Sequence, residues 1–141
     1  MNCLGELTRQ AAQQILTDNF AAWVQELGLS VESVGKGAAV LRMPYSARLI
    51  RVGGTLCGQA LMSAADTAMV IALSGSFDEF KPVTTVSQNM TFMRPIAEQD
   101  VLVDARVIRL GKTLAFGEIT LRGAKDERTA AHATTTYAIL G

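Results

Sequence analysis

One apolar stretch in the middle of the chain, residues 51–73, constrains the fold more than any other part of the sequence. It opens with glycines and continues without a proline or, beyond Arg51, a basic side chain. From Thr55 to about Ser74 it predicts one long helix of roughly 30 Å, at 1.5 Å per residue. Apolar residues cover nearly every direction around that helix axis, which is typical of a helix buried on all sides. We therefore expect a fold built around a buried central helix.

A single carboxylate, Asp66, lies in the middle of this predicted helix. Aspartate is rarely buried without a partner, and Asp66 lies too deep in the helix to cap a start near Thr55. One structural alternative is that the helix breaks here and that Asp66 and Thr67 cap a second segment, although no turn precedes them. The other is a functional carboxylate that faces a cavity or a subunit interface and serves as acid, base or nucleophile. We favour the functional interpretation.

Length and composition predict one soluble domain over residues 1–141. Apolar residues make up 49% of the chain and charged residues only 18%, a surplus that suggests surface hidden in an oligomer. The formal net charge of +0, without a run of Lys or Arg, argues against a nucleic-acid partner. Cys3 and Cys57 make no disulfide framework, which fits a reducing cytoplasm. We expect no export signal, because residues 1–6 lack a basic start followed by an apolar core. We expect no membrane span, because the apolar run Leu61–Leu73 is too short to cross a bilayer and contains Asp66.

The rest of the chain predicts an amphipathic helix and two groups of strands. The helix covers about Glu6 to Leu27, could be interrupted at Thr17–Asn19, and includes Phe20 and Trp23, which we interpret as packing residues. The expected strands are Leu29–Val34 and Ala38–Met43, joined by a glycine turn, and then about Val83–Met93, Val101–Leu110, Thr113–Arg122 and Arg128–Ile139. Because the connectors between the last four strands are short, we expect those four to be antiparallel neighbours in chain order, as a meander.

A sheet with one apolar face that curls around a long helix buries both elements at once, and this α+β arrangement is that of the hotdog fold. The segment Gly54–Ala68 resembles the Gly-Thr-x-His-Gly-Gly … Ala/Val-Asp stretch of the phenylacetate-type (PaaI-like) acyl-CoA thioesterases. Thr84–Pro95 resembles the next strand of that family, which ends in Phe/Tyr-x-x-Pro. In place of the family's His-Gly-Gly the chain has Cys57-Gly58-Gln59, and Arg51 stands where many members have a polar residue. The resemblance implies a hotdog thioesterase with Asp66 as the catalytic carboxylate.

The chemistry of thioester hydrolysis assigns roles to two positions on the helix. The reaction needs a nucleophile or an activated water, and donors aimed at the developing oxyanion. Gly58 lies in the first turn, where backbone N–H groups lack partners and a carbonyl can approach closely. Asp66, the expected base or nucleophile, lies some 12 Å further along the helix, so one carbonyl is not expected to touch both groups of one chain. A two-fold dimer would bring Gly58 of one subunit beside Asp66 of the other.

Further residues are expected to contact the acyl-CoA substrate. Thr85 would help to hold the attacking water, with an ordinary strand threonine as the equally weighted alternative. The expected substrate-binding residues are Arg51, Cys57 and Gln59 around Gly58, Met62 and Met69 in an acyl pocket, and Arg94 and Lys112 for the CoA phosphates. We expect a homodimer or a dimer-of-dimers tetramer and no cofactor. We also expect no metal, because two cysteines and one histidine lack the spacing of a zinc site.

Three alternatives stay open at this point. Cys57 at a helix N-terminus could act as a nucleophile with His132 as its base, although a small packing cysteine is more usual. The missing family histidine and the presence of Arg51 motivate a non-catalytic acyl-CoA-binding or regulatory protein. A hydratase on the same fold ranks lowest, because the predicted helix has no histidine near Asp66.

Overall fold

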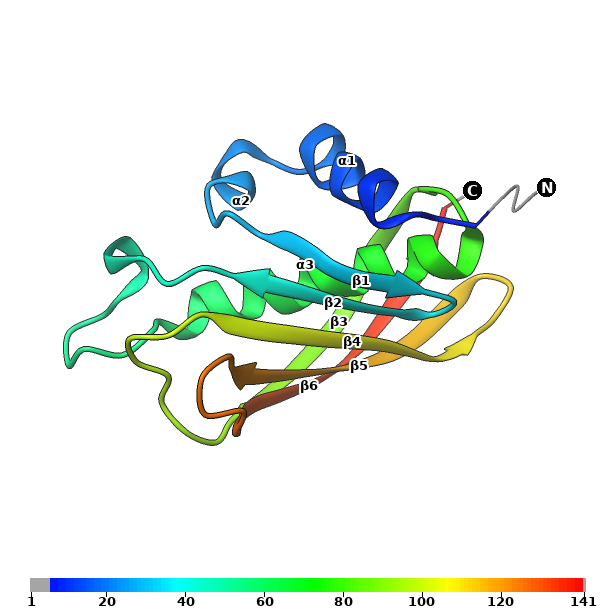
Figure 1. Cartoon of the computed structure of the whole chain (residues 1–141). Coiled ribbons are helices and arrows are strands. Elements are labelled where there is room, and N and C mark those ends of the chain that lie inside the picture. Colours follow the sequence, from blue (N-terminus) through cyan, green and yellow to red (C-terminus); the bar gives the residue numbers. More distant parts are fainter. Residues whose placement is uncertain (1–5, 141) are drawn as a thin grey trace.

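The computed structural model describes residues 6–140 and consists of a six-stranded antiparallel sheet wrapped around one long helix (Figure 1). The helices are α1 (Arg9–Asn19), α2 (Ala22–Gln25) and α3 (Gly58–Phe77), and a 3-10 turn, η1, covers Ala47–Leu49. The strands are β1 (Ser30–Gly35), β2 (Ala38–Met43), β3 (Val83–Phe92), β4 (Val101–Leu110), β5 (Leu114–Gly123) and β6 (Thr129–Ile139). The predicted α+β class, with a sheet around a central helix, is confirmed.

The order of the strands corrects the predicted meander. The order is β1-β2-β4-β5-β6-β3, so β3 lies at one edge of the sheet and pairs with β6 instead of β4. The connector 93–100 therefore crosses three strand spacings, roughly 14 Å at about 4.8 Å each, which about eight extended residues can easily span. Its buried residue Ile96 accepts a hydrogen bond from the Leu56 N–H at 2.9 Å, which ties the crossing to the start of α3. A short connector was thus not enough to make β3 and β4 neighbours.

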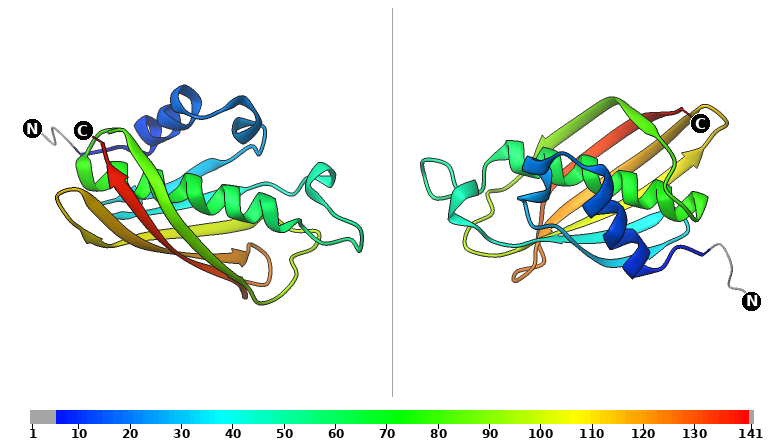
Figure 2. Two further views of the ribbon diagram at one scale, coloured as in Figure 1. Left: turned by 180° about the vertical axis from the view of Figure 1, so that it is seen from behind. Right: turned by 90° about the horizontal axis from the view of Figure 1, so that it is seen from above.

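The central helix α3 lies across one face of the sheet and forms the core with it (Figure 2). It runs without a break through Asp66, so the alternative of two helical segments is wrong. The helix begins at Gly58 instead of Thr55, because Cys57 has an extended backbone with ψ 148° and Leu56 forms an isolated β-bridge with Ile50. By length and hydropathy α3 resembles a membrane span, but 67% of its most apolar window is buried inside the protein. Its apolar character therefore reflects its place in the core.

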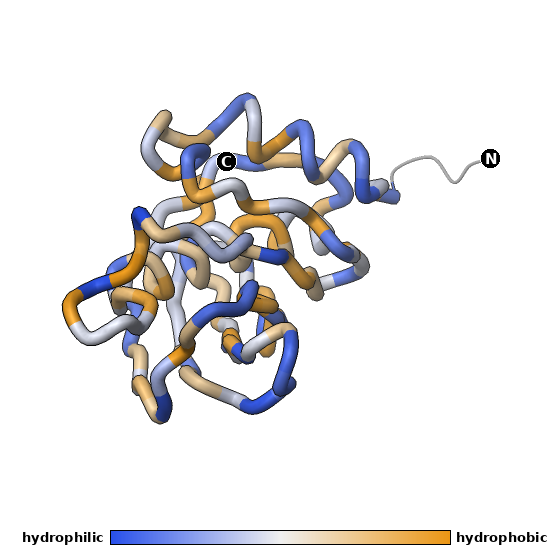
Figure 3. Tube along the Cα trace, turned by 60° about the vertical axis from the view of Figure 1, so that its left-hand side comes forward, coloured by the Kyte–Doolittle hydropathy of each residue, from blue (hydrophilic) through white to orange (hydrophobic). Residues whose placement is uncertain are grey.

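Small side chains allow α3 to approach the sheet closely. A Cβ atom on Gly75 would lie 2.0 Å from the carbonyl oxygen of Gly35 in β1, so this contact needs a glycine. Five buried alanines line the rest of the helix: Ala60, Ala64, Ala65, Ala68 and Ala72. Along the trace in Figure 3, hydrophobic residues recur throughout these packed elements, and hydrophilic residues mark several of the outer loops. The close packing fixes the rotation of α3 and hence the direction of its polar side chains.

The predicted N-terminal helix is wrong as one element, because the chain forms α1 and α2 with an extended break between them. Phe20 and Ala21 both have ψ 151°, and the Gln25 side chain donates to the carbonyls of Thr17 and Phe20 at the end of α1. The interruption lies just after the predicted segment Thr17–Asn19. Trp23 is 58% exposed, so its predicted role in packing is also wrong. Cys3 lies outside the described residues.

Candidate functional site

The carboxylate of Asp66 is half-buried on α3 and faces the strands β3 and β6. Its Oδ1 atom accepts hydrogen bonds from the hydroxyl of Thr85, at 2.8 Å, and from the hydroxyl of Tyr137. The Tyr137 hydroxyl also lies 2.9 Å from the main-chain carbonyl of Asp66. No described residue donates to Oδ2. One carboxylate oxygen is thus held by two strands while the other is left without a protein partner.

A bulge in β3 brings Thr85 to this position. Residues directly opposite in an antiparallel pair share a face of the sheet, and Thr85 pairs with Tyr137. The register then shifts at Val86, so that Ser87 pairs with Thr136 and Gln88 with Thr135. A one-residue bulge reverses the alternation of side chains along a strand. Both Thr85 and Gln88 therefore face α3, where the Gln88 amide donates to the Met62 carbonyl at 3.2 Å.

Tyr137 is the functional candidate that the sequence analysis missed. Its side chain is only 1% exposed, and burial followed by the neighbouring Asp66 charge raises its pKa well above the ordinary value of 10. The phenol therefore stays protonated and can donate at any physiological pH. In the sequence, Tyr137 cannot be told apart from an ordinary aromatic core residue of a strand. The available signal is that a buried tyrosine needs a partner for its hydroxyl, but only the sheet register identifies that partner.

The second part of the site is the start of α3, where Gly58 is the first helical residue. The preceding residue, Cys57, is the N-cap, but its side chain makes no capping hydrogen bond. The first N–H groups of the helix are therefore not occupied by the Cys57 thiol. A Cβ atom at Gly58 would lie 3.2 Å from the ring of the half-exposed Phe92, so a larger residue here would require that ring to shift. An open pocket of about 410 Å³ adjoins this glycine. Its lining residues are Arg51, Thr55, Leu56, Gly58, Leu61, Phe92, Met93, Arg94, Pro95 and Ile96.

The other predicted binding residues fall into separate places. Cys57 and Gln59 line a second pocket of about 250 Å³ that also includes Trp23. Met62 is partly exposed, whereas Met69 is buried in the core against Gly117 of β5. Lys112 lies in the β4–β5 turn, at the opposite end of α3 from Gly58 (Figure 1). Within one chain, the structure brings Arg51 and Arg94 to the Gly58 pocket and leaves Met69 and Lys112 apart from it.

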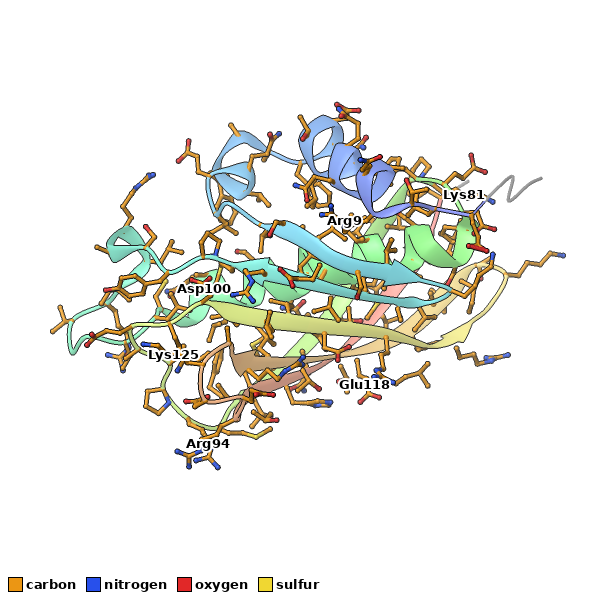
Figure 4. The ribbon with its side chains drawn as sticks, viewed as in Figure 1. Arg9, Lys81, Arg94, Asp100, Glu118 and Lys125 are labelled. Carbon is orange, nitrogen blue, oxygen red and sulfur yellow. The ribbon has the colours of Figure 1, made fainter. Side chains whose placement is uncertain are left out.

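The proposed partnership of Cys57 with His132 does not form in the chain. His132 pairs with Thr91 and Thr120, on the face of the sheet opposite to Tyr137, and its Nε2 atom lies 3.0 Å from Glu118 Oε1. Figure 4 labels Glu118 on this outer side of the sheet. Within one chain, His132 is therefore not in a position to act as a base for Cys57. Among residues 6–140, no three His, Cys, Asp or Glu side chains gather closely enough to hold a metal ion.

Gly58 and Asp66 lie eight positions apart on one helix, which is about 12 Å by rise. A thioester carbonyl bound at the Gly58 N–H therefore lies out of reach of Asp66 in the same chain. The two groups have complementary chemistry, an oxyanion donor and a base, but a complete site needs both at the same carbonyl.

Comparisons with known proteins place this arrangement in a family. A family model described as the thioesterase superfamily matches residues 53–130, which include Gly58, Asp66 and Thr85. A Halobacterium salinarum protein, provisionally named an esterase, is 34% identical over 67% of this chain. That match covers 66% of the relative's own length, so the chain spans slightly less than two thirds of it.

Solved structures have the same fold. Thioesterase superfamily member 2 of zebrafish is 26% identical with a TM-score of 0.85, and the match covers 96% of this chain and 100% of that one. The Escherichia coli PaaI protein from the phenylacetic acid degradation operon is 23% identical with a TM-score of 0.81, covering 95% and 96% of the two chains. At that identity the likeness to PaaI shows the fold alone. Together with the family model, which covers more than half of the sequence, these similarities show that the chain is a hotdog-fold member of the thioesterase superfamily.

Proposed function

We propose that the protein hydrolyses an acyl-CoA thioester to a free acid and CoA, with Asp66 as the general base. The observation that carries this proposal is the asymmetric anchoring of the carboxylate. Two hydroxyl donors hold Oδ1, and Oδ2 has no partner among residues 6–140. A carboxylate fixed through one oxygen presents the other to water in a defined direction, which is what a general base needs. The thioesterase family supports the reaction class.

The proposed site is completed by a second copy of the chain. β3 pairs with β6 along one side only, so its other side is a ten-residue open edge. Val86, Phe92 and Met93 on and just after this strand are large, exposed apolar residues. Open edges of this length are sites of strand pairing. A two-fold axis beside β3 would set the two α3 helices antiparallel and bring Gly58 of one subunit toward Asp66 of the other. A homodimer is the smallest such assembly, and a dimer of dimers would preserve it.

In the proposed reaction, water donates a proton to Asp66 Oδ2 as its oxygen attacks the thioester carbon. The carbonyl oxygen becomes an oxyanion, which accepts a hydrogen bond from the Gly58 N–H of the partner subunit. The positive end of the helix dipole stabilises the oxyanion there. The tetrahedral intermediate then expels the CoA sulfur, which takes the proton back from Asp66. The products are the acid and the CoA thiol. Because CoA esters and a free Cys57 thiol suit a reducing compartment, the proposal includes the cytoplasm as its location.

The test is hydrolysis of a panel of acyl-CoA thioesters by the wild-type protein and by Asp66→Asn, followed by the loss of thioester absorbance. This detection avoids thiol dyes, which would react with Cys57. We expect kcat to fall about 10²- to 10⁴-fold in Asp66→Asn, the range for loss of a general base. Unchanged turnover in that variant would refute the role of Asp66. A wild-type protein that binds CoA esters without turnover would instead support a non-catalytic acyl-CoA-binding protein.

A single turnover in ¹⁸O-labelled water can identify Asp66 as a nucleophile, because label in its carboxylate would exclude a role as base alone. If Asp66 activates water, the label enters the released acid and none enters the protein. If Asp66 attacks the thioester itself, a mixed anhydride forms and its hydrolysis can leave ¹⁸O in the Asp66 carboxylate. Mass spectrometry of the peptide that contains Asp66 measures this directly. We expect an unlabelled peptide.

A further inference from the structure

The pocket beside Gly58 contains two cationic side chains and no acidic one. Arg51 enters it from the loop before α3 and Arg94 from the connector after β3, while every other lining residue is uncharged. Neither arginine forms an ion pair with another residue of the described range 6–140. In contrast, the neighbouring Arg48 is paired with Glu26 at 3.3 Å. The lining of this pocket therefore has a net positive charge, although Arg94 also interacts electrostatically with Asp126 outside it.

Both arginines are anchored by main-chain carbonyls and keep other donors unused. Arg51 Nη1 donates to the Val52 carbonyl at 2.9 Å, and Arg94 Nε donates to the Thr129 carbonyl at 3.2 Å. A guanidinium has five N–H donors, so each arginine retains several for a ligand. Figure 4 shows that the Arg94 side chain projects at the end of the molecule where the connector after β3 begins. Anchored arginines with free donors are well suited to bind a carboxylate or a phosphate.

An acyl-CoA can offer such an anion in two places, and their distances from the thioester differ. With the thioester carbonyl at the Gly58 N–H, the nearest CoA phosphorus is about 13 bonds from the sulfur, or roughly 16 Å in an extended arm. Arg51 and Arg94 line the same pocket of about 410 Å³ as Gly58, so an anion that they bind lies close to the bound thioester carbonyl. A carboxylate at the far end of a four- or five-carbon acyl group is about 4–5 Å from the thioester carbon. The acyl carboxylate fits the pocket dimensions better than the phosphate.

We propose that Arg51 and Arg94 bind a carboxylate on the acyl group, so that the preferred substrates are CoA thioesters of short dicarboxylic acids. The proposal rests on the proposed function, because it places the thioester at Gly58. It assigns to Arg51 and Arg94 together the selection of acyl groups that carry a negative charge. Thr55 and the two arginines then provide the polar part of the acyl site, and Leu56, Leu61 and Phe92 provide its apolar wall.

The experiment compares glutaryl and hexanoyl groups, which have similar lengths and differ in the terminal charge. Each is presented on CoA and on N-acetylcysteamine, a carrier without phosphates. The proteins are wild type, Arg51→Gln, Arg94→Gln and the control Arg109→Gln, whose exposed arginine lies on β4, outside the pocket. We expect each pocket variant to lower kcat/KM for the glutaryl esters about tenfold on both carriers, the cost of one charge-assisted contact. The hexanoyl esters and the control should change by less than about twofold.

Two results would overturn the proposal. If the arginines bind phosphate, the pocket variants will weaken both CoA esters equally and leave both N-acetylcysteamine esters unchanged. If they are only solvated surface charges, no ester will be affected. Failure of the proposed function looks different, because then no thioester is hydrolysed or Asp66→Asn keeps its activity. In that case calorimetric binding of glutaryl-CoA and hexanoyl-CoA to the same variants still decides the inference, since equal affinities in wild type would refute it.

Discussion

The two ends of the candidate site on α3 are built in opposite ways. Around Asp66 the carboxylate is held by Thr85 and by the buried Tyr137, each from a different strand. Around Gly58 the pocket is open, and its two arginines come from loops and are held only by main-chain carbonyls. Side chains on packed strands are positioned more precisely than those on loops. We infer that the two ends have different roles. The rigidly held carboxylate of Asp66 performs the chemical step, and the more open pocket at Gly58 selects the substrate.

The largest expected effect comes from separating the two ends, which the proposed dimer brings together. Val86→Glu places a charge on the open edge of β3, and the two-fold axis would put two such charges near each other. We expect a monomer whose kcat/KM is lower by about 10²-fold or more, the cost of losing an oxyanion donor. Sedimentation equilibrium and thioester hydrolysis measure the two effects.

Ile108→Glu is the matched control for the interface. Ile108 is 62% exposed and Val86 58%, but Ile108 lies on β4, away from the β3 edge. We expect it to remain dimeric and active. An active monomer of Val86→Glu would contradict the idea that Gly58 and Asp66 act across subunits.

A smaller effect is expected from loosening the Asp66 end. Tyr137→Phe removes one of the two donors to Oδ1, and we expect kcat to fall about tenfold with KM within about twofold, because carboxylate orientation matters mainly in the transition state. The other described tyrosine, Tyr45, lies on a loop and supplies the control Tyr45→Phe, which should leave kcat unchanged. Thr85→Ser, which keeps a hydroxyl, should retain more activity than Thr85→Val.

A purely structural role of Tyr137 would give another pattern. The thermal midpoint of Tyr137→Phe would fall while its kcat stayed at the wild-type value. That result would leave Thr85 as the sole positioning partner of Asp66 and would weaken the contrast between the two ends.

The buried phenol also predicts a pH dependence of stability. The pKa of Tyr137 is raised in the folded protein, so between pH 10 and the folded pKa the folded state binds more protons than the unfolded state. Stability therefore declines as the pH rises above 10, by about 1 kcal/mol between pH 10 and 11 for one such group. Urea unfolding of wild type and Tyr137→Phe across this pH range measures the contribution of Tyr137 to the decline. Equal changes of unfolding free energy with pH in the two proteins would contradict the prediction.

The sequence identified individual residues of this site better than it identified their contacts with one another. Asp66 and Gly58 stood out because a lone carboxylate and a glycine at a helix start are local features of one apolar helix. The place of β3 beside β6, and the bulge at Val86 that turns Thr85 toward α3, depend on pairing between distant residues. A one-residue shift in register exchanges the two faces of a strand, so alternation in the sequence could not identify the partner of Tyr137. Likewise, Arg51 and Arg94 are far apart in the chain, and only the fold places them in one pocket.

The smallest expected effect concerns buried polar atoms near Asp66 that lack a hydrogen-bond partner. Thr135 is 4% exposed, its Oγ1 atom has no hydrogen-bond partner, and it lies opposite Gln88, whose Oε1 atom is also unpartnered. Burying an unpartnered hydroxyl is costly, so Thr135→Val should stabilise the protein by up to about 1 kcal/mol. Thr67→Val is the matched control, because Thr67 is 3% exposed but donates to the Ser63 carbonyl at 2.8 Å. We expect that control to be neutral or destabilising in urea unfolding. If Thr135→Val destabilises instead, a water molecule shared with Gln88 is the simplest partner for its hydroxyl, and the fixed end of the site is then hydrated as well as anchored.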